Sequence, residues 1–187
     1  MIETKKLILR RFIEEDIETV WRWKNDSGLS LYESSDPYAT MSKNEIMDTY
    51  IGNRDLYAIC LKGDSPKLIG EASFWFPNTL STSTVEVGIS ISEGTYREKG
   101  FGAEISLAVG RKIFNNPKIH KIVLCVGGHN HHSKLPLEKM VKLEGIIRKD
   151  RYIDGEYYDT YVFGLLREEF NTLVNRVERK GTVNVKE

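Results

Sequence analysis

A glycine-rich turn joins a strand-like run to a helix-like run in the middle of the chain, and this junction constrains the fold more than any other feature. The turn lies between the apolar runs 85–91 and 103–114, and its sequence is Tyr96-Arg97-Glu98-Lys99-Gly100-Phe101-Gly102-Ala103. Two glycines one residue apart allow a tight turn that exposes main-chain N–H groups at the start of a helix, where the macrodipole favours negative charge. The junction therefore predicts a phosphate-binding turn.

Two common phosphate-binding motifs do not fit this turn. A Walker-type loop requires Gly-Lys-Ser/Thr at the helix start, whereas Phe101 follows Gly100. A dinucleotide-binding fingerprint requires a glycine three residues after Gly102, where the chain has Ile105. The pattern that remains is Arg-x-x-Gly-x-Gly followed by a small residue. The alternative interpretation of these residues is a helix that simply starts after a flexible turn.

Length and charge exclude several classes of protein. The 187 residues fit one domain, 1–187, in which 167–187 form a C-terminal helix and tail, and such a domain buries a core without a structural metal. Basic and acidic residues number 27 each, so no net positive field recruits nucleic acid. No run approaches the roughly 20 apolar residues that span a bilayer, and the first residues lack the apolar centre of a signal peptide. We expect a cytoplasmic protein with neither nucleic acid nor a membrane as partner.

The two cysteines, Cys60 and Cys125, each lie inside an apolar strand-like run. In such a run a small buried thiol is the expected role, rather than a disulfide or a nucleophile. We therefore predict that both belong to the core.

Hydrophobic periodicity predicts strands and helices in alternation. Before the turn, the expected elements are a strand at 7–11, helices at 13–23 and 43–51, and an antiparallel meander of strands at 56–61, 67–76 and 84–91. The capping box Ser42-Lys43-Asn44-Glu45 marks the second helix. After the turn, they are a helix at 103–114, a strand at 122–126, a hairpin of 146–153 and 157–166 around Asp154-Gly155, and a closing helix with Phe170, Leu173, Val174 and Val177 inward. The strand, crossing helix and strand around the turn imply parallel neighbours.

The Arg-x-x-Gly-x-Gly turn resembles the pyrophosphate-binding loop of the GNAT superfamily of acetyl-CoA-dependent N-acetyltransferases. Segments 2–11, 85–88 and 144–157 extend the likeness to the branch of ribosomal-protein and spermidine N-acetyltransferases, across roughly residues 1 to 170. The resemblance implies an α+β fold of the α/β/α GNAT type. Its sheet would be mixed, mostly antiparallel and twisted, with a splayed parallel pair of central strands and helices on both faces.

The resemblance also implies where acetyl-CoA, the co-substrate, binds. The pantetheine arm would lie on backbone groups of Ile89, Ser90 and Ile91. The phosphates would lie on the N–H groups of Arg97, Glu98, Lys99, Gly100, Phe101, Gly102 and Ala103, and Asn130 matches an asparagine that hydrogen-bonds the cofactor arm. Other roles stay open, because Ile89 and Ile91 suit a sheet core, Arg97 and Lys99 suit a solvated surface, and Asn130 is a natural helix cap. The turn at 92–95 is one residue longer than its counterpart in relatives, and we expect the chain to absorb the insertion.

Acetylation of an amine requires a base, since an alkyl amine with a pKa of about 10.4 is mostly protonated at neutral pH. The resemblance makes Glu86 the candidate, acting through water. The alternative is that Glu86 faces solvent or pairs with a cation on the next strand. A backbone N–H near Ile91 would stabilise the oxyanion.

The general acid that relatives use, a Tyr seven residues after the asparagine, is Leu137 in this chain. A thiol has a pKa near 8.5, so its thiolate can leave without obligatory protonation. His131 or Ser133 could substitute, and His129, His131 and His132 do not have the spacing of a metal site, so no metal is expected. Pro136 should break the helix after Asn130 or delay its start to about Lys134 or Leu135.

Together these residues predict an acetyl-CoA-dependent N-acetyltransferase that acts on a primary amine, either a protein N-terminus, a polyamine or an amino sugar. The alternative is a non-catalytic acyl-CoA-binding or regulatory module, because the usual acid is missing. The resemblance implies that the choice of the amine acceptor depends on the loop at 27–40 and on the last hairpin. In that loop, Glu33 and Asp36 could attract a cation. Relatives often form homodimers, and nothing in the sequence decides this for the chain.

Overall fold

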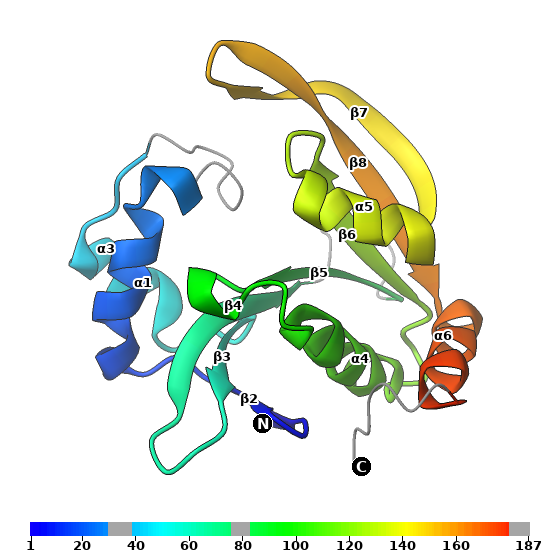
Figure 1. The fold of residues 1–187 in the computed structure, drawn as a ribbon, viewed down its shortest axis with the longest axis horizontal. Coiled ribbons are helices and arrows are strands. Elements are labelled where there is room, and N and C mark those ends of the chain that lie inside the picture. The colour runs from blue at the N-terminus through cyan, green and yellow to red at the C-terminus, as the bar shows by residue number, and fades with distance from the viewer. Residues whose placement is uncertain (30–38, 76–82, 180–187) are drawn as a thin grey trace.

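The computed structural model describes residues 1–29, 39–75 and 83–179. They form an eight-stranded sheet with the order β1-β2-β3-β4-β5-β6-β8-β7 (Figure 1). The strands are β1 Ile2–Glu3, β2 Leu7–Arg10, β3 Leu56–Leu61, β4 Lys67–Trp75, β5 Thr84–Ser90, β6 Lys121–Gly127, β7 Lys142–Ile153 and β8 Glu156–Leu166. The helices are α1 Ile17–Lys24, α3 Lys43–Tyr50, α4 Phe101–Phe114, α5 His131–Met140 and α6 Arg167–Arg179, with short 3-10 turns η1 Glu14–Asp16 and η2 Gly94–Tyr96.

The sheet is mixed, because β5 and β6 run parallel while the other neighbours are antiparallel. β5 and β6 pair from Thr84 with Lys121 to Glu86 with Val123, and in the described part of the chain the pairing ends there. Both strands continue for four more residues, to Ser90 and Gly127. The expected splayed parallel pair is therefore confirmed, and we call the gap beyond Glu86 and Val123 the splay.

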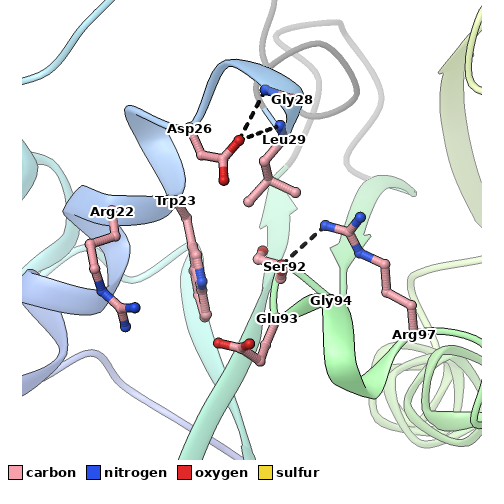
Figure 2. Close-up of a pocket in the computed structure, with 9 residues that line it drawn as sticks. All are labelled: Arg22, Trp23, Asp26, Gly28, Leu29, Ser92, Glu93, Gly94 and Arg97. Atoms are coloured by element: carbon pink, nitrogen blue, oxygen red, sulfur yellow. Dashed lines mark hydrogen bonds between the residues drawn. The ribbon is translucent and has the colours of Figure 1, made fainter.

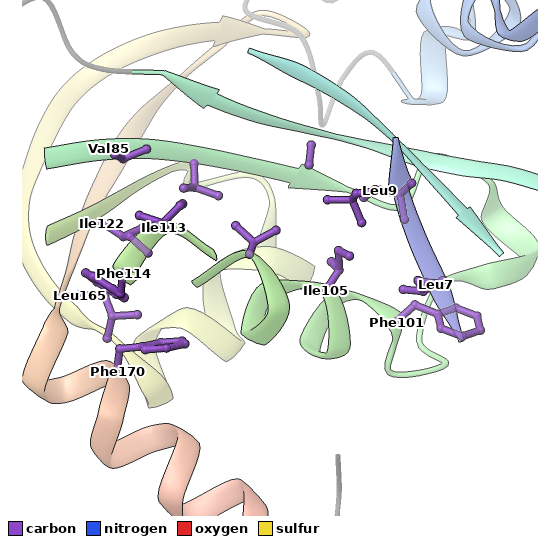
Figure 3. Close-up of a cluster of buried hydrophobic side chains, with 14 of the residues drawn as sticks. Leu7, Leu9, Val85, Phe101, Ile105, Ile113, Phe114, Ile122, Leu165 and Phe170 are labelled. Carbon is purple, nitrogen blue, oxygen red and sulfur yellow. The ribbon is translucent and has the colours of Figure 1, made fainter. Parts of the chain in front are cut away.

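Helices cover both faces of the sheet, as predicted. On one face, the helices α4 and α6 bury the larger core, which includes Leu7, Leu9, Val85, Ile105, Ile113, Phe114, Ile122 and Phe170 (Figure 3). On the other face, α1 and α3 pack over β2, β3 and β4 around a second cluster that contains Val20, Ile46, Ala58 and Cys60 (Figure 1). Alternation along β5 explains the division, because Val85 and Val87 face the larger core and Glu86 faces away.

Local signals account for several elements. Ser42 accepts a hydrogen bond from the Glu45 N–H while the Glu45 carboxylate accepts one from the Ser42 N–H, which confirms the capping box of α3. Asp154 and Gly155 have φ angles of 49° and 87°, as a two-residue hairpin turn between β7 and β8 requires. The inward position of Phe170 is confirmed, since its ring lies 5.2 Å from that of Phe114.

Two predictions were wrong. Pro136 lies inside α5, which begins directly at His131 rather than near Lys134. Proline removes one main-chain hydrogen bond, and here the Asn130 cap and the packing of α5 against β6 and β7 hold the helix despite that loss. Cys125 is exposed rather than buried, because alternation along β6 turns it to the face opposite α4, whereas Cys60 is buried as expected.

Some predicted features lie outside the described residues. They are Glu33 and Asp36 of the acceptor loop, Phe76 at the end of the second meander strand and the tail beyond residue 179. Among the described helices, none is long and apolar enough to cross a bilayer.

Candidate active site

The glycine turn brings unpaired main-chain donors to the N-terminus of α4. Gly100 is the N-cap with a φ angle of 80°, and the N–H of Glu104 makes a helical bond back to the Gly100 carbonyl at 3.1 Å. The N–H groups of Phe101, Gly102 and Ala103 precede that bond and have no partner within the helix, and Gly100 has no side chain to cap them. A Cβ built at Gly100 or Gly102 meets no atom within 4 Å, so the main chain is open to an approaching anion.

Neighbouring side chains fix the turn in place. Phe101 buries its ring in the larger core and so anchors the first turn of α4. Arg97 donates from Nε to the Ile91 carbonyl at 2.9 Å and from Nη2 to the Ser92 carbonyl at 3.0 Å, which ties the turn to the end of β5. Lys99 lies over the Tyr96 ring, with its Nζ 5.2 Å from the centroid. The donors therefore lie on a braced loop with positive charge beside it.

The turn before the loop contains a short 3-10 segment, and its extra residue relative to relatives stays a prediction. Residues 94–96 form η2, in which the Tyr96 N–H bonds to the Glu93 carbonyl at 3.0 Å. The preceding strand end is held close to β4, because a Cβ at Gly70 would overlap the Ser90 carbonyl oxygen. Ile89 and Ile91 are half-buried against the larger core, which matches their alternative role in the sheet and leaves their backbone role a prediction.

A pocket of about 460 Å³ opens between the end of α1 and the turn that leads to the glycine loop (Figure 2). Its volume is within the usual range for small-molecule sites. Charges of both signs surround an aromatic wall, and the lining residues are Arg22, Trp23, Asp26, Gly28, Leu29, Ser92, Glu93, Gly94 and Arg97. One carboxylate oxygen of Asp26 already has partners, because it accepts hydrogen bonds from the N–H groups of Gly28 and Leu29 at 2.9 and 3.2 Å. The pocket therefore places charged side chains of both signs beside the Trp23 ring.

Glu86 lies on the face of β5 opposite α4, at the point where the splay begins. It is half-buried between Trp75 of β4 and Val123 of β6, its two cross-strand neighbours, and Trp75 is 48 % exposed on that face. We call the face of the sheet that carries the Glu86 and Trp75 side chains the open face. Cys125, two residues beyond Val123, lies on the same face of the sheet. Burial, first, and then the Glu86 carboxylate raise the pKa of the Cys125 thiol to about 11.

A second carboxylate lies on the open face near the end of β5. Glu71 is directly opposite Ser90, accepts a hydrogen bond from the Tyr50 hydroxyl at 2.8 Å and pairs with Lys24 Nζ at 2.7 Å. These partners come from α1 and α3, so the helices that cover the second cluster also fix the acidic side of the open face. Glu71 of β4 and Glu86 of β5 are therefore two carboxylates on adjacent strands of the open face.

Asn130 is the N-cap of α5, where its side-chain oxygen accepts a hydrogen bond from the Ser133 N–H at 3.1 Å. The capping role is thus confirmed, and the contact with a cofactor stays a prediction. His132 Nδ1 lies 3.9 Å from Glu98 Oε1, while the His129 ring packs on Tyr158 at 5.4 Å. The three histidines do not converge, and the residues that the structure describes contain no cluster of three metal-binding side chains.

Sequence reasoning missed two groups of residues. The pocket wall from α1 and the turn after it, chiefly Trp23 and Asp26, depends on how α1 packs over the sheet, and no local signal predicts it. Cys125 could have been found, because Lys121, Val123 and Cys125 alternate with the buried Ile122 and with Leu124, which packs against the larger core. A charged residue in that register indicates that the face is not core.

Comparisons with known proteins identify relatives of the whole arrangement. The sequence profile of the acetyltransferase (GNAT) domain matches residues 6–140. The uncharacterized N-acetyltransferase YnaD of Bacillus subtilis (strain 168) is 25% identical over 172 residues, which are 91% of this chain and 99% of that protein. The GNAT-family acetyltransferase of Bacillus anthracis is 25% identical with a TM-score of 0.72, covering 89% of this chain and 98% of that one. The spermidine N-acetyltransferase of Vibrio cholerae in complex with CoA and spermine is 21% identical with a TM-score of 0.73, covering 88% and 98%.

Proposed function

Since the chain belongs to the GNAT acetyltransferase family and is an N-acetyltransferase, we propose that its acyl donor is acetyl-CoA and its acceptor a primary amine. The observation that carries the choice of donor is the row of open N–H groups at Phe101, Gly102 and Ala103 on the N-terminus of α4. These donors suit a diphosphate, because charge-assisted hydrogen bonds and the helix dipole act on it together.

The pantetheine arm extends from these phosphates along the end of β5 into the splay. The backbone of Ile89, Ser90 and Ile91 lies on that path, and the pairing of β5 with β6 ends before it. The thioester then lies at the open face beside Glu86, with the Ile91 N–H as donor to the oxyanion.

Glu86 takes the proton of the incoming amine, directly or through one water. It lies on the open face at the start of the splay, beside the exposed Trp75. The Glu86 carboxylate favours a cationic acceptor by charge, which fits a protein N-terminus, a polyamine or an amino sugar in its protonated form, whereas Glu71 is already paired with Lys24. The spermine bound by the Vibrio cholerae relative supports the polyamine among these.

Thiol release from acetyl-CoA, measured with a panel of spermidine, glucosamine and a short peptide with a free N-terminus, tests the proposal. We expect turnover with at least one amine, and a kcat for Glu86→Gln that is lower by about 10²-fold. The variant Glu3→Gln is the control, because Glu3 is an exposed carboxylate on β1 that pairs with Lys62. Tight CoA binding without turnover for any amine would instead favour a non-catalytic acyl-CoA-binding module.

A further inference from the structure

Three side chains from different elements meet at one carboxylate on the open face. The Tyr50 hydroxyl donates a hydrogen bond to Glu71 Oε2 at 2.8 Å, and Lys24 Nζ lies 2.7 Å from Glu71 Oε1. Each oxygen of the carboxylate therefore has a donor of its own. Lys24 Nζ also lies 6.0 Å from the centroid of the Tyr50 ring. We call Glu71, Tyr50 and Lys24 the Glu71 network.

The Glu71 network joins two helix ends to the sheet. Lys24 is the last residue of α1, Tyr50 is the last residue of α3, and β4 carries Glu71. Tyr50 is 5 % exposed, and its ring packs edge-on against Phe12 at 4.8 Å, so the hydroxyl is presented from a fixed position. The carboxylate thus holds the C-terminal ends of α1 and α3 at one point of β4.

The same carboxylate lies at the end of β5, beside the pocket. Glu71 is directly opposite Ser90, the last residue of β5, and Ser92 lines the pocket from that side. Trp23, which directly precedes Lys24, lines it from α1 (Figure 2). We call the part of the pocket that Trp23 lines the α1 wall. The Glu71 network therefore connects the α1 wall to the strand end on the opposite side of the pocket.

Stability alone gives little reason for a charged network at this place. The side chains of Lys24 and Glu71 are only 19 % and 18 % exposed, so both charges have lost most of their water. The cost of that desolvation largely offsets the attraction in a buried ion pair, and apolar side chains of similar volume are often as stabilising. Hydrogen bonds to a carboxylate have a defined length and direction, which apolar contacts lack. The network therefore fixes the position of α1 more than it adds to stability.

We propose that Glu71 is a positioning residue, which through Lys24 and Tyr50 holds the α1 wall against the end of β5 and so sets the affinity for the amine acceptor. The inference rests on the proposed acetyl transfer at the open face, which α1 and α3 border on the side of β4. A displacement of about 1 Å far from the chemistry can lower a rate about 100-fold. The glycine turn is braced separately, by the bonds of Arg97 to the main chain. The network therefore acts on the acceptor and leaves CoA binding unchanged.

Steady-state kinetics with Tyr50→Phe test the inference in the full chain, because this change removes one hydroxyl and leaves Glu71 paired with Lys24. We expect the KM for the amine to rise about 10-fold, with kcat and the KM for acetyl-CoA little changed. Lys24→Met should act in the same direction, and Lys24→Arg should restore most of the affinity, since a guanidinium also pairs with a carboxylate. Lys43→Met is the matched control, because Lys43 of α3 pairs with Glu18 of α1 at an exposed site without the sheet. An unchanged KM for the amine, or an equal rise in the KM for acetyl-CoA, would overturn the positioning role.

Hydrogen exchange measures the network without any turnover. The amide exchange of α1 is followed by mass spectrometry in the wild type, in Tyr50→Phe and in Lys43→Met. We expect exchange at the C-terminal end of α1 to become severalfold faster in Tyr50→Phe, because local opening is easier once the helix end is released, and to stay unchanged in Lys43→Met. Equal exchange in Tyr50→Phe and the wild type would overturn the network. An active wild type with an unaffected Tyr50→Phe removes this inference alone, whereas a wild type inactive toward every amine removes the proposed function with it.

Discussion

Replacing Gly102 with alanine separates the role of the glycine turn in folding from its role in binding. Gly102 is the second residue of α4, and a Cβ built there meets no atom of the protein within 4 Å. In a helix, alanine is more favourable than glycine by roughly 0.5–1 kcal/mol, because glycine loses more backbone freedom on folding. The free energy of unfolding of Gly102→Ala should therefore rise by about that amount, as measured by urea denaturation without ligand.

The same methyl group should weaken the binding of CoA. It occupies the space through which a phosphate oxygen would reach the N–H groups of Gly102 and Ala103. Loss of one hydrogen bond to a charged group costs roughly 1.5–3 kcal/mol, which is about a 10- to 150-fold increase in Kd. Isothermal titration calorimetry with CoA measures this change directly.

Gly102→Ala should thus raise the free energy of unfolding and weaken the binding of CoA, so the two effects can be told apart. Gly63→Ala, in the turn between β3 and β4, is the matched control, because its Cβ also meets open space and should leave the Kd for CoA unchanged. A Gly102→Ala protein that is more stable and binds CoA as the wild type does would refute the phosphate-binding role of the turn. A less stable variant would refute the reasoning about helix propensity.

Three further predictions concern stability. Gly110→Ala should lower the free energy of unfolding by about 1–3 kcal/mol in urea denaturation, because its Cβ would overlap the Phe170 ring between α4 and α6. Ser42→Ala should cost about 1 kcal/mol, measured the same way, through loss of the capping box of α3. Burial raises the pKa of the Cys60 thiol from 9.0 to about 11. The contribution of the neutral thiol to the free energy of unfolding is therefore complete below pH 9 and is lost as the pH rises through 11. The stability difference between the wild type and Cys60→Ala should shrink over that range, and a constant difference would contradict the shift.

Much of the fold could be predicted from short segments. The Asp154-Gly155 pair predicts the hairpin because both residues must have positive φ, and the structure has that geometry. The alternation of Val85, Glu86 and Val87 predicts a strand with one buried face. These signals act over a few residues, so the sequence carries them without reference to the rest of the molecule.

The errors have a common origin in packing. Pro136 disfavours a helix locally, yet α5 includes it because contacts with β6 and β7 outweigh the lost hydrogen bond. Cys125 lies in an apolar run typical of a core strand, yet its side chain is on the face of β6 opposite α4 and is exposed. Burial is a property of what lies opposite a residue, and composition alone does not reveal it.

The amino-acid sequence by itself determined the order of strands and helices and the glycine turn at the start of α4, because propensity, capping and turn geometry are local. Only the tertiary structure decided that β5 and β6 separate after Glu86 and Val123, that α1 supplies one wall of a pocket beside the turn, and that Cys125 is exposed. These features join residues far apart in the chain, and their positions follow from strand register and helix packing across the whole sheet.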